Sequence, residues 1–377
     1  MKPMSAPRAL TSLALAIAAL TGSAAQADSP LGWVHTDHIS AYTLNERTFE
    51  LSLGALAVNE DLDFLDVRED LLAGTRQLEG DSGDISGNNL ELHVGIMPWL
   101  SAYYRRQQSD LVIDIGEVRS INLLDLDDGL VTTSQSYGFK WAIFESGNFD
   151  RARPWGAVSL EVARTANKTD NFTGVLDRIT LNSNLVISFT NPQNFEVDQM
   201  EDDGWLARLL YSFPVSPTLS ATTWAGFAEN EAQSGTRSDI PVPSLASAFE
   251  QSFKTDNSQL LLGASLVWQI TPRMPLQLSY EYIRLNDSDL EVTSNPNNVL
   301  LPSFLRADNL GTVSAEDNHT LRGSLTYWIT PQFTVSLTGK LFSNQFLGII
   351  PHYTNPLSAS FSDQPYGYAG INLGFRL

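Results

Sequence analysis

Residues 260–282 read LLLGASLVWQITPRMPLQLSYEY, which is two alternating segments joined by a short turn that contains two prolines. A period of two is the pattern of a β-strand that has one apolar face. Each segment is about 9–12 residues long, the length that a tilted strand needs to cross a bilayer. The apolar positions are Leu260, Leu262, Ala264, Leu266 and Trp268 before the turn and Leu276, Leu278, Tyr280 and Tyr282 after it.

Alternating segments recur along the whole chain, and the connections between them differ in length. Further strands of this kind begin near Phe49, Tyr137, Leu321 and Phe333. Short turns on one side and long loops on the other are typical of outer-membrane barrels. The short turns lie at 97–99, 146–154, 214–217, 271–275 and 330–332, and the long polar stretches lie at 59–87, 114–133, 165–203, 229–257, 286–317 and 343–365.

The turns also predict the number of strands. Five short turns join ten strands, and a first and a last strand bring the count to about 12, an even number as in bacterial barrels. Fourteen strands result if residues 179–189 (ITLNSNLVISF) form half of a membrane hairpin instead of a ladder within a loop. The sequence therefore predicts an all-β fold, a transmembrane antiparallel β-barrel with short periplasmic turns and long extracellular loops.

Composition excludes several other classes of protein. The chain has 23 Lys and Arg against 43 Asp and Glu, a formal net charge of −20, and no cysteine. A basic stripe for nucleic acid, a disulfide and a thiolate metal site are therefore excluded. After residue 27 no apolar run reaches the roughly 18–20 residues that a spanning helix requires.

The N-terminus has the three parts of a bacterial secretory signal peptide. Lys2 and Arg8 give the positive start, residues 9–20 give a short apolar core, and Ala25-Gln26-Ala27 gives a cleavage site after Ala27. We expect residues 1–27 to be the signal peptide, residues 28–47 to be an N-terminal periplasmic or lumenal segment, and residues 48–377 to be the barrel in the cell outer membrane.

Aromatic residues are expected at the membrane interfaces. Amphipathic rings favour the headgroup level, where their apolar body and polar edge are both accommodated. Tryptophans at or beside the short turns are Trp99, Trp155, Trp268 and Trp328. These four side chains are predicted to form the periplasmic belt.

The last strand carries a family resemblance. Residues 366–377 (YGYAGINLGFRL) have apolar residues at every second position back from the end, at Leu377, Phe375, Leu373, Ile371 and Ala369. This segment resembles the terminal strand of Gram-negative outer-membrane β-barrels of the porin and transporter kind, whose last residue is usually aromatic. The resemblance implies that the strand is read by the barrel-assembly machinery and pairs with the first strand.

The inward parity of the predicted strands gives the candidate site. A charged side chain facing lipid at mid-bilayer costs about 2–4 kcal/mol for Arg or Lys, so charges within the strands are expected in the lumen. The inward positions carry at least five cations against four carboxylates, and Arg322 and Lys340 are on neighbouring strands. The interior is therefore predicted to be far less negative than the whole chain. The lumen-lining candidates are Lys140, Arg208, Arg322, Lys340, Glu50, Glu91, Glu161 and Glu281, with Arg376 on the same parity.

Motifs for catalysis and metal binding are weak. Gly80-Asp81-Ser82-Gly83 resembles the nucleophile motif of trypsin-like proteases, but that family continues with Gly-Pro, whereas Asp84 follows here. His93 and Glu91 share a face, which suits a lumenal polar pair, and His35 and His38 lack a further ligand. A nucleophile, base and orienting group cannot be assembled, so we expect no enzyme, no catalytic residue, no metal and no cofactor.

Function is predicted from the polar lumen. We expect a passive channel or transporter for small solutes, and two alternatives remain open, an outer-membrane enzyme acting on lipid and a structural or adhesive barrel without conductance. Expected partners are outer-membrane lipid and lipopolysaccharide, the barrel-assembly machinery through the C-terminal strand, and a small solute, but no nucleic acid. Apolar clusters at 245–253, 299–305 and 346–350 are expected to form short helices or folded-in segments at the barrel mouth.

The predicted location has a direct test. The protein should fractionate with outer membranes and should migrate differently on gels before and after boiling, because closed barrels resist detergent until they are heated. Recovery as a soluble periplasmic monomer without detergent would rule out the barrel.

Overall fold

The structure is a computed structural model that describes residues 39–58, 84–112, 121–124, 130–145, 156–181, 185–300, 317–342 and 366–377. Twelve strands in this part of the chain close into an antiparallel barrel, which confirms the predicted fold and count. The barrel strands are β1 (Phe49–Val58), β2 (Asp84–Met97), β3 (Leu100–Val112), β5 (Leu130–Glu145), β6 (Ala157–Thr169), β8 (Val186–Ser216), β9 (Leu219–Ser238), β10 (Gln251–Thr271), β11 (Met274–Ser294), β12 (Asp317–Trp328), β13 (Phe333–Phe342) and β14 (Tyr366–Arg376).

Closure is made by the first and last strands. β1 pairs with β14 from Glu50 opposite Arg376 to Ala57 opposite Ala369. The ends of the seam are also bonded, since Leu377 N donates to Phe49 O at 2.9 Å. The C-terminal strand therefore pairs with the first strand, as its resemblance to terminal strands of outer-membrane barrels implies.

The outer face of the barrel is apolar. Along β5, Phe139 and Trp141 are more than half exposed, whereas Lys140 between them is buried in the interior. Exposed aromatic rings lie towards both edges of this face, with Trp99, Trp141 and Trp268 near the short turns and Trp205, Tyr137 and Tyr280 towards the other end. An apolar band between two aromatic girdles is the surface of an outer-membrane barrel, and the protein is one.

No helix among the described residues is long and apolar enough to cross a membrane.

The predicted tryptophan belt is partly wrong. Trp99 and Trp268 lie on the outer face as expected, and Trp155 lies outside the described residues. Trp328 is only 7% exposed. Its even residue number on β12 gives it the same parity as Ser324 and Thr326, which point inward.

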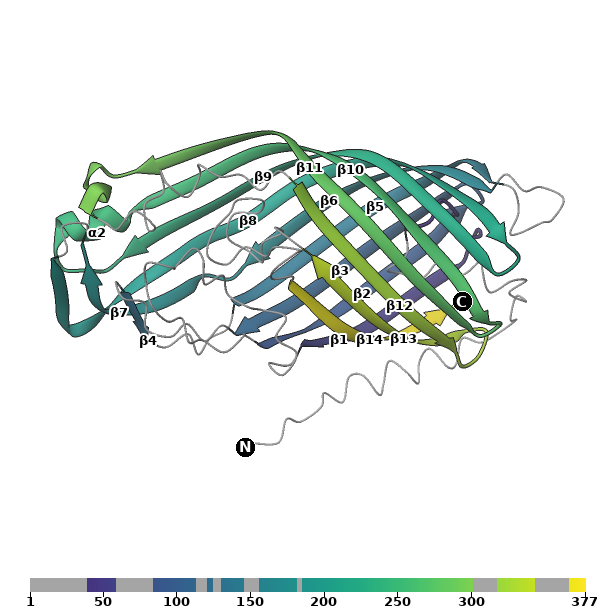
Figure 1. Cartoon of the computed structure of the whole chain (residues 1–377), viewed down its shortest axis with the longest axis horizontal. Helices are drawn as coiled ribbons and strands as arrows, with labels where there is room; N and C mark the ends of the chain where they lie inside the picture. The colour runs from purple at the N-terminus through teal and green to yellow at the C-terminus, as the bar shows by residue number, and fades with distance from the viewer. Residues whose placement is uncertain are drawn as a thin grey trace.

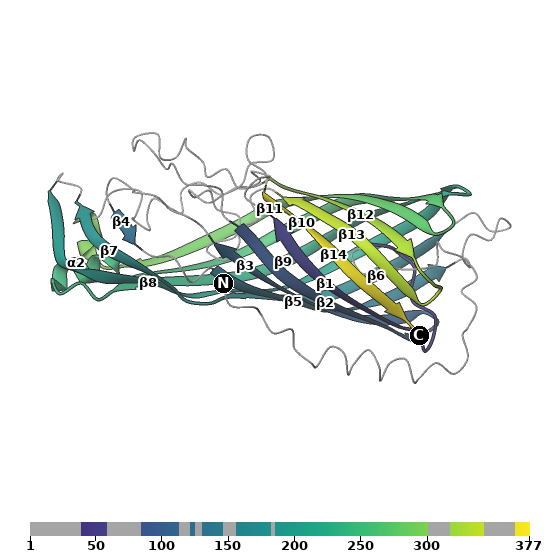
Figure 2. The ribbon, with the colours of Figure 1, turned by 90° about the horizontal axis from the view of Figure 1, so that it is seen from below.

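Four strands extend well beyond the rest of the barrel. β8, β9, β10 and β11 have 31, 20, 21 and 21 residues, and Figures 1 and 2 show them running past the other strands towards α2 (Pro243–Phe249). β7 (Phe172–Thr180) and β4 (Ile121–Leu124) add to the edge of this extension through β8. On the orientation that the short turns give, the extension lies outside the cell.

The extension corrects the prediction of loops at 165–203 and 229–257, which are mostly strand. Polar side chains on both faces hid these strands from a search for apolar alternation. Ion pairs hold them, and hydrogen bonds from Arg237 at 2.7 and 2.9 Å lower the pKa of Glu196 below its usual value. The described residues of this range, 179–181 and 185–189, lie in this ladder, where Ile179 pairs with Ile187, so the alternative of fourteen barrel strands is wrong.

The end of the extension has its own apolar cluster. Leu245, Ala248 and Phe249 of α2 pack with Ile179 of β7 and with Ile240. The cluster at 245–253 thus begins as the predicted short helix, and its last residues enter β10. Residues 299–300 belong to the 3-10 helix η4 (Pro296–Leu300), whereas the rest of 299–305 and all of 346–350 lie outside the described residues.

Removing the last strand should prevent assembly. Deletion of residues 366–377 leaves β1 and β13 with unpaired edges that lipid cannot satisfy. We expect degradation or periplasmic aggregation, measured by outer-membrane fractionation and by the loss of heat-modifiable migration. Deletion of residues 243–249, which lie in the extension outside the barrel wall, is the control and should still insert. A truncated chain that inserts and remains heat-modifiable would contradict closure through β14.

Candidate functional site in the barrel lumen

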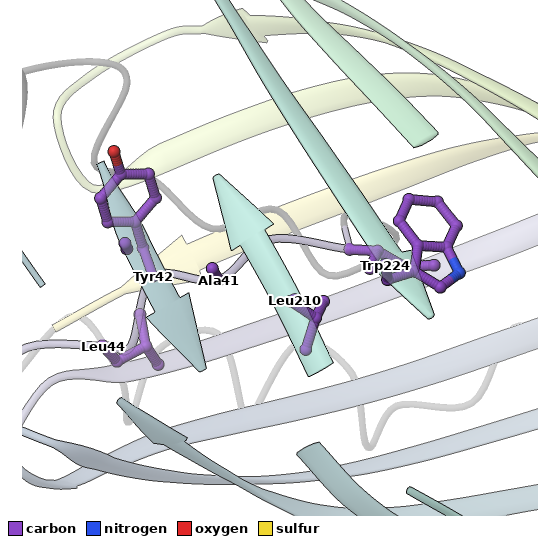
Figure 3. Close-up of a cluster of buried hydrophobic side chains, with 7 residues drawn as sticks. Ala41, Tyr42, Leu44, Leu210 and Trp224 are labelled. Carbon is purple, nitrogen blue, oxygen red and sulfur yellow. The ribbon is translucent and has the colours of Figure 1, made fainter. Parts of the chain in front are cut away.

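A segment that precedes the first strand lies inside the barrel. Ile39, Ala41, Tyr42 and Leu44 are all buried and form one cluster with the lumenal side chains of Ala157, Leu210 and Trp224. Figure 3 shows the stretch from Leu44 through Ala41 approaching the strands that carry Leu210 and Trp224. We call residues 39–44 the N-terminal plug.

Hydrogen bonds attach the N-terminal plug to the wall. Ala41 N donates to Ser212 Oγ at 2.8 Å, and Ser265 Oγ donates to Ile39 O at 3.3 Å. Lys140 Nζ donates to Tyr42 O at 3.5 Å, and Thr43 Oγ1 donates to Pro98 O at 3.1 Å. Pro98 is in the short turn between β2 and β3, so the plug occupies the periplasmic end of the lumen.

A layer of buried ion pairs lies above the N-terminal plug. Lys140, Glu161 and Arg208 stand directly opposite one another on β5, β6 and β8. The guanidinium of Arg208 donates to both oxygens of Glu161 at 2.9 and 3.0 Å and contacts Glu281 at 3.5 Å. Bidentate Arg–carboxylate pairs are among the strongest polar contacts in proteins. The layer therefore joins strands on both sides of the lumen.

Two aromatic side chains complete this layer. Tyr103 Oη donates to Glu161 at 2.6 Å, and Trp224 Nε1 donates to Glu281 at 3.2 Å. Each ring lies over a glycine on the next strand. A Cβ at Gly263 would meet the Trp224 ring at 2.1 Å, and a Cβ at Gly138 would meet Tyr103 at 2.8 Å. These glycines let the rings lie flat against the wall and reach the carboxylates.

A second set of charges lies on β1, β2, β3 and β14. Arg105 and Glu91 stand opposite each other with Nε and Oε2 3.4 Å apart, and His93 Nε2 lies 3.7 Å from the same oxygen. Arg376 and Glu50 face each other across the closing seam at 3.5 Å. The predicted His93–Glu91 pair is therefore present, within a larger network that includes Arg105.

Above the ion pairs lies a cavity of about 460 Å³. Its wall extends from Arg208 and Glu281 up to Asp202 and Asn230, and Arg322 and Lys340 also line it. One side of the wall is apolar and carries Leu206, Ala228, Leu261 and Ile283, which pack together on four adjacent strands. We call these four residues the lumenal apolar patch.

The structure places the eight predicted lumen residues on the inner face. Glu50, Glu91, Lys140, Glu161, Arg208 and Glu281 are buried in the ion-pair layers, and Arg322 and Lys340 line the cavity. The sequence prediction missed Arg105, Tyr103, Trp224 and the lumenal apolar patch. Arg105 shares the inward parity of Tyr103 on β3, a signal that was available in the sequence.

The other residues considered in the sequence are on the outer face or lie outside the described residues. His319 is on the outer face, where Tyr280 hydrogen-bonds its Nδ1 at 2.7 Å. Residues 80–83, with Ser82, and His35, His38 and His352 lie outside the described residues. Within the described residues, no group of three His, Cys, Asp or Glu side chains is arranged to hold a metal ion.

Comparisons with known proteins find similar barrels. No family model and no curated protein sequence matches the chain. A Pseudomonas aeruginosa FadL homologue is 11% identical with a TM-score of 0.45, covering 88% of this chain and 90% of that one. The Ralstonia pickettii toluene transporter TbuX is 10% identical with a TM-score of 0.38, covering 93% and 91%. The Escherichia coli outer-membrane protease OmpT is 8% identical with a TM-score of 0.34, covering 88% and 94%. At such values the likeness says nothing of the solute or activity of this chain.

The aromatic packing can be tested with one methyl group. Gly263→Ala places a Cβ about where the Trp224 ring lies, so the ring must move away from Glu281. Overpacking of this kind costs about 1–3 kcal/mol. We expect a lower urea midpoint for unfolding from lipid vesicles.

Gly339→Ala is the matched control. A Cβ at Gly339 meets its nearest atom at 3.9 Å, which is ordinary contact, so this variant should unfold like the parent. Equal midpoints for the two variants would show that Trp224 does not depend on Gly263.

Proposed function

We propose that the protein is a passive outer-membrane transporter for small solutes, which enter from the cell surface and leave to the periplasm when the N-terminal plug moves. The observation that carries this proposal is the cavity directly above the ion-pair layer and the N-terminal plug. A site within the lumen and a removable obstruction below it are what stepwise passage requires.

The contacts of the N-terminal plug favour a removable obstruction. Its cluster with the wall is small, and its hydrogen bonds through Thr43, Lys140 and Ser265 are 3.1–3.5 Å long. Each such bond contributes only about 0.5–1.5 kcal/mol net. The barrel itself does not depend on the plug, because every barrel strand is paired with its neighbours.

The ion-pair layer favours a second candidate function, a closed structural barrel. Glu161 and Arg208 are almost completely buried, and breaking such a pair costs about 3–5 kcal/mol. In this case the paired charges close the lumen permanently and the protein conducts nothing. Conductance separates the two candidates.

A disulfide between the N-terminal plug and the wall gives the sharpest test. The chain has no cysteine, so Ala41→Cys with Ser212→Cys introduces the only thiols. Ala41 N and Ser212 Oγ are 2.8 Å apart, which brings the two positions within reach of a bridge. In planar bilayers the oxidised protein should show little solute flux or ion conductance, and reduction should restore the level of the parent.

The single variant Ala41→Cys is the control and should not respond to reductant. Equal conductance in the oxidised and reduced double variant would contradict a role for the plug in passage. A complete lack of conductance in the parent and in all variants would favour the closed structural barrel.

A further inference from the structure

The lumenal apolar patch is unexpected in a polar pore. Leu206 stands opposite Ala228, and Leu261 stands opposite Ile283, and the four side chains pack in one cluster that spans β8 to β11. A channel for water and ions has no need of such a surface, whereas ligand pockets combine apolar walls with a few placed polar groups. The patch points to a solute with an apolar body.

Two cations face each other beside the patch. Arg322 on β12 stands directly opposite Lys340 on β13, and both line the cavity. Like charges in directly opposite positions destabilise a sheet, so an anion that bridges them would be favoured. Arg322 also lies close to the patch, since it contacts Glu281 at 3.7 Å and Glu281 is two positions from Ile283 on the same face. Two positions along a strand span roughly 7 Å.

Arg322 can leave Glu281 for another partner, because this carboxylate keeps its contacts with two other side chains. Glu281 also receives Trp224 Nε1 at 3.2 Å and Arg208 at 3.5 Å, and the contact with Arg322 is the longest of the three. Both arginines line the cavity, and the Arg322 side chain is 29% exposed, compared with 8% for Arg208. An arriving anion could therefore engage Arg322 while Arg208 and Trp224 hold Glu281.

We propose that the cavity binds a small amphipathic organic anion, with its carboxylate between Arg322 and Lys340 and its apolar body on the lumenal apolar patch. This inference rests on the proposed transport function, to which it adds the class of solute. The cavity of about 460 Å³ is within the range of pockets for small molecules.

Binding to the purified, detergent-solubilised full-length chain tests the proposal without requiring conductance. The probes are benzoate, benzyl alcohol and benzylammonium, which share a ring and differ in charge, together with acetate, which has the carboxylate without the ring. Titration calorimetry should rank benzoate above benzyl alcohol, with benzylammonium and acetate weakest. Each hydrogen bond between the carboxylate and a cationic side chain should raise the affinity about tenfold or more.

Two variants separate the parts of the site. Arg322→Gln with Lys340→Gln should lower the affinity for benzoate to that for benzyl alcohol. Leu261→Ser should weaken both ligands and leave acetate unchanged. Lys254→Gln is the matched control, because this lysine pairs with Glu231 on the exposed surface of the extension, and it should bind like the parent. Heat-modifiable migration confirms that each variant is folded.

The outcomes distinguish this proposal from the function on which it rests. Equal binding of benzoate and acetate would show a site for charge alone, and equal binding of benzoate and benzyl alcohol would show no use of the cations. Either result would overturn the proposal even if the protein conducts. Selective benzoate binding in a protein that never conducts would instead support the site and refute transport.

Discussion

In hydrocarbon a backbone N–H or C=O without a partner costs several kcal/mol, and the pairing of β1 with β14 closes the wall so that neither strand is left as an open edge. Closure with twelve strands also determines how much space remains inside. Side chains of inward parity from all strands converge in that space, and most of those near the periplasmic end are buried. The chemistry of the lumen is therefore a direct consequence of closing the sheet.

Crowding explains why the inner charges are arranged in pairs. A buried charge without a partner is strongly destabilising, so each inward carboxylate in the described membrane-spanning part has a cationic neighbour. Space for these contacts comes from inward glycines such as Gly263 and Gly138, which allow rings from one strand to cross over the next. The same arrangement separates a compact, paired lower lumen from the wider cavity above it.

Much of the fold could be predicted from the sequence because lipid imposes a strict pattern. Alternation in β10 and β11, with a short turn between them, follows from one face in lipid and one in the lumen. Parity also placed Glu161 and Arg208 inside. Beyond the membrane both faces meet water, so β8 and β9 continue as strands without any alternation to reveal them. For residues 28–47 the sequence left a periplasmic and a lumenal location open, because the position of the N-terminal plug depends on contacts with Ser212 and Ser265, far away in the chain.

The attachment of the N-terminal plug has a kinetic consequence. Only a few residues separate Leu44 from the start of β1 at Phe49, so a plug that leaves its site remains tethered beside it. A short tether gives an effective concentration on the order of millimolar for rebinding. Weak contacts, which would hardly join two separate molecules, are then sufficient to return the segment to its place. In the proposed transport cycle, closing is therefore a unimolecular event, independent of how many copies of the protein the membrane contains.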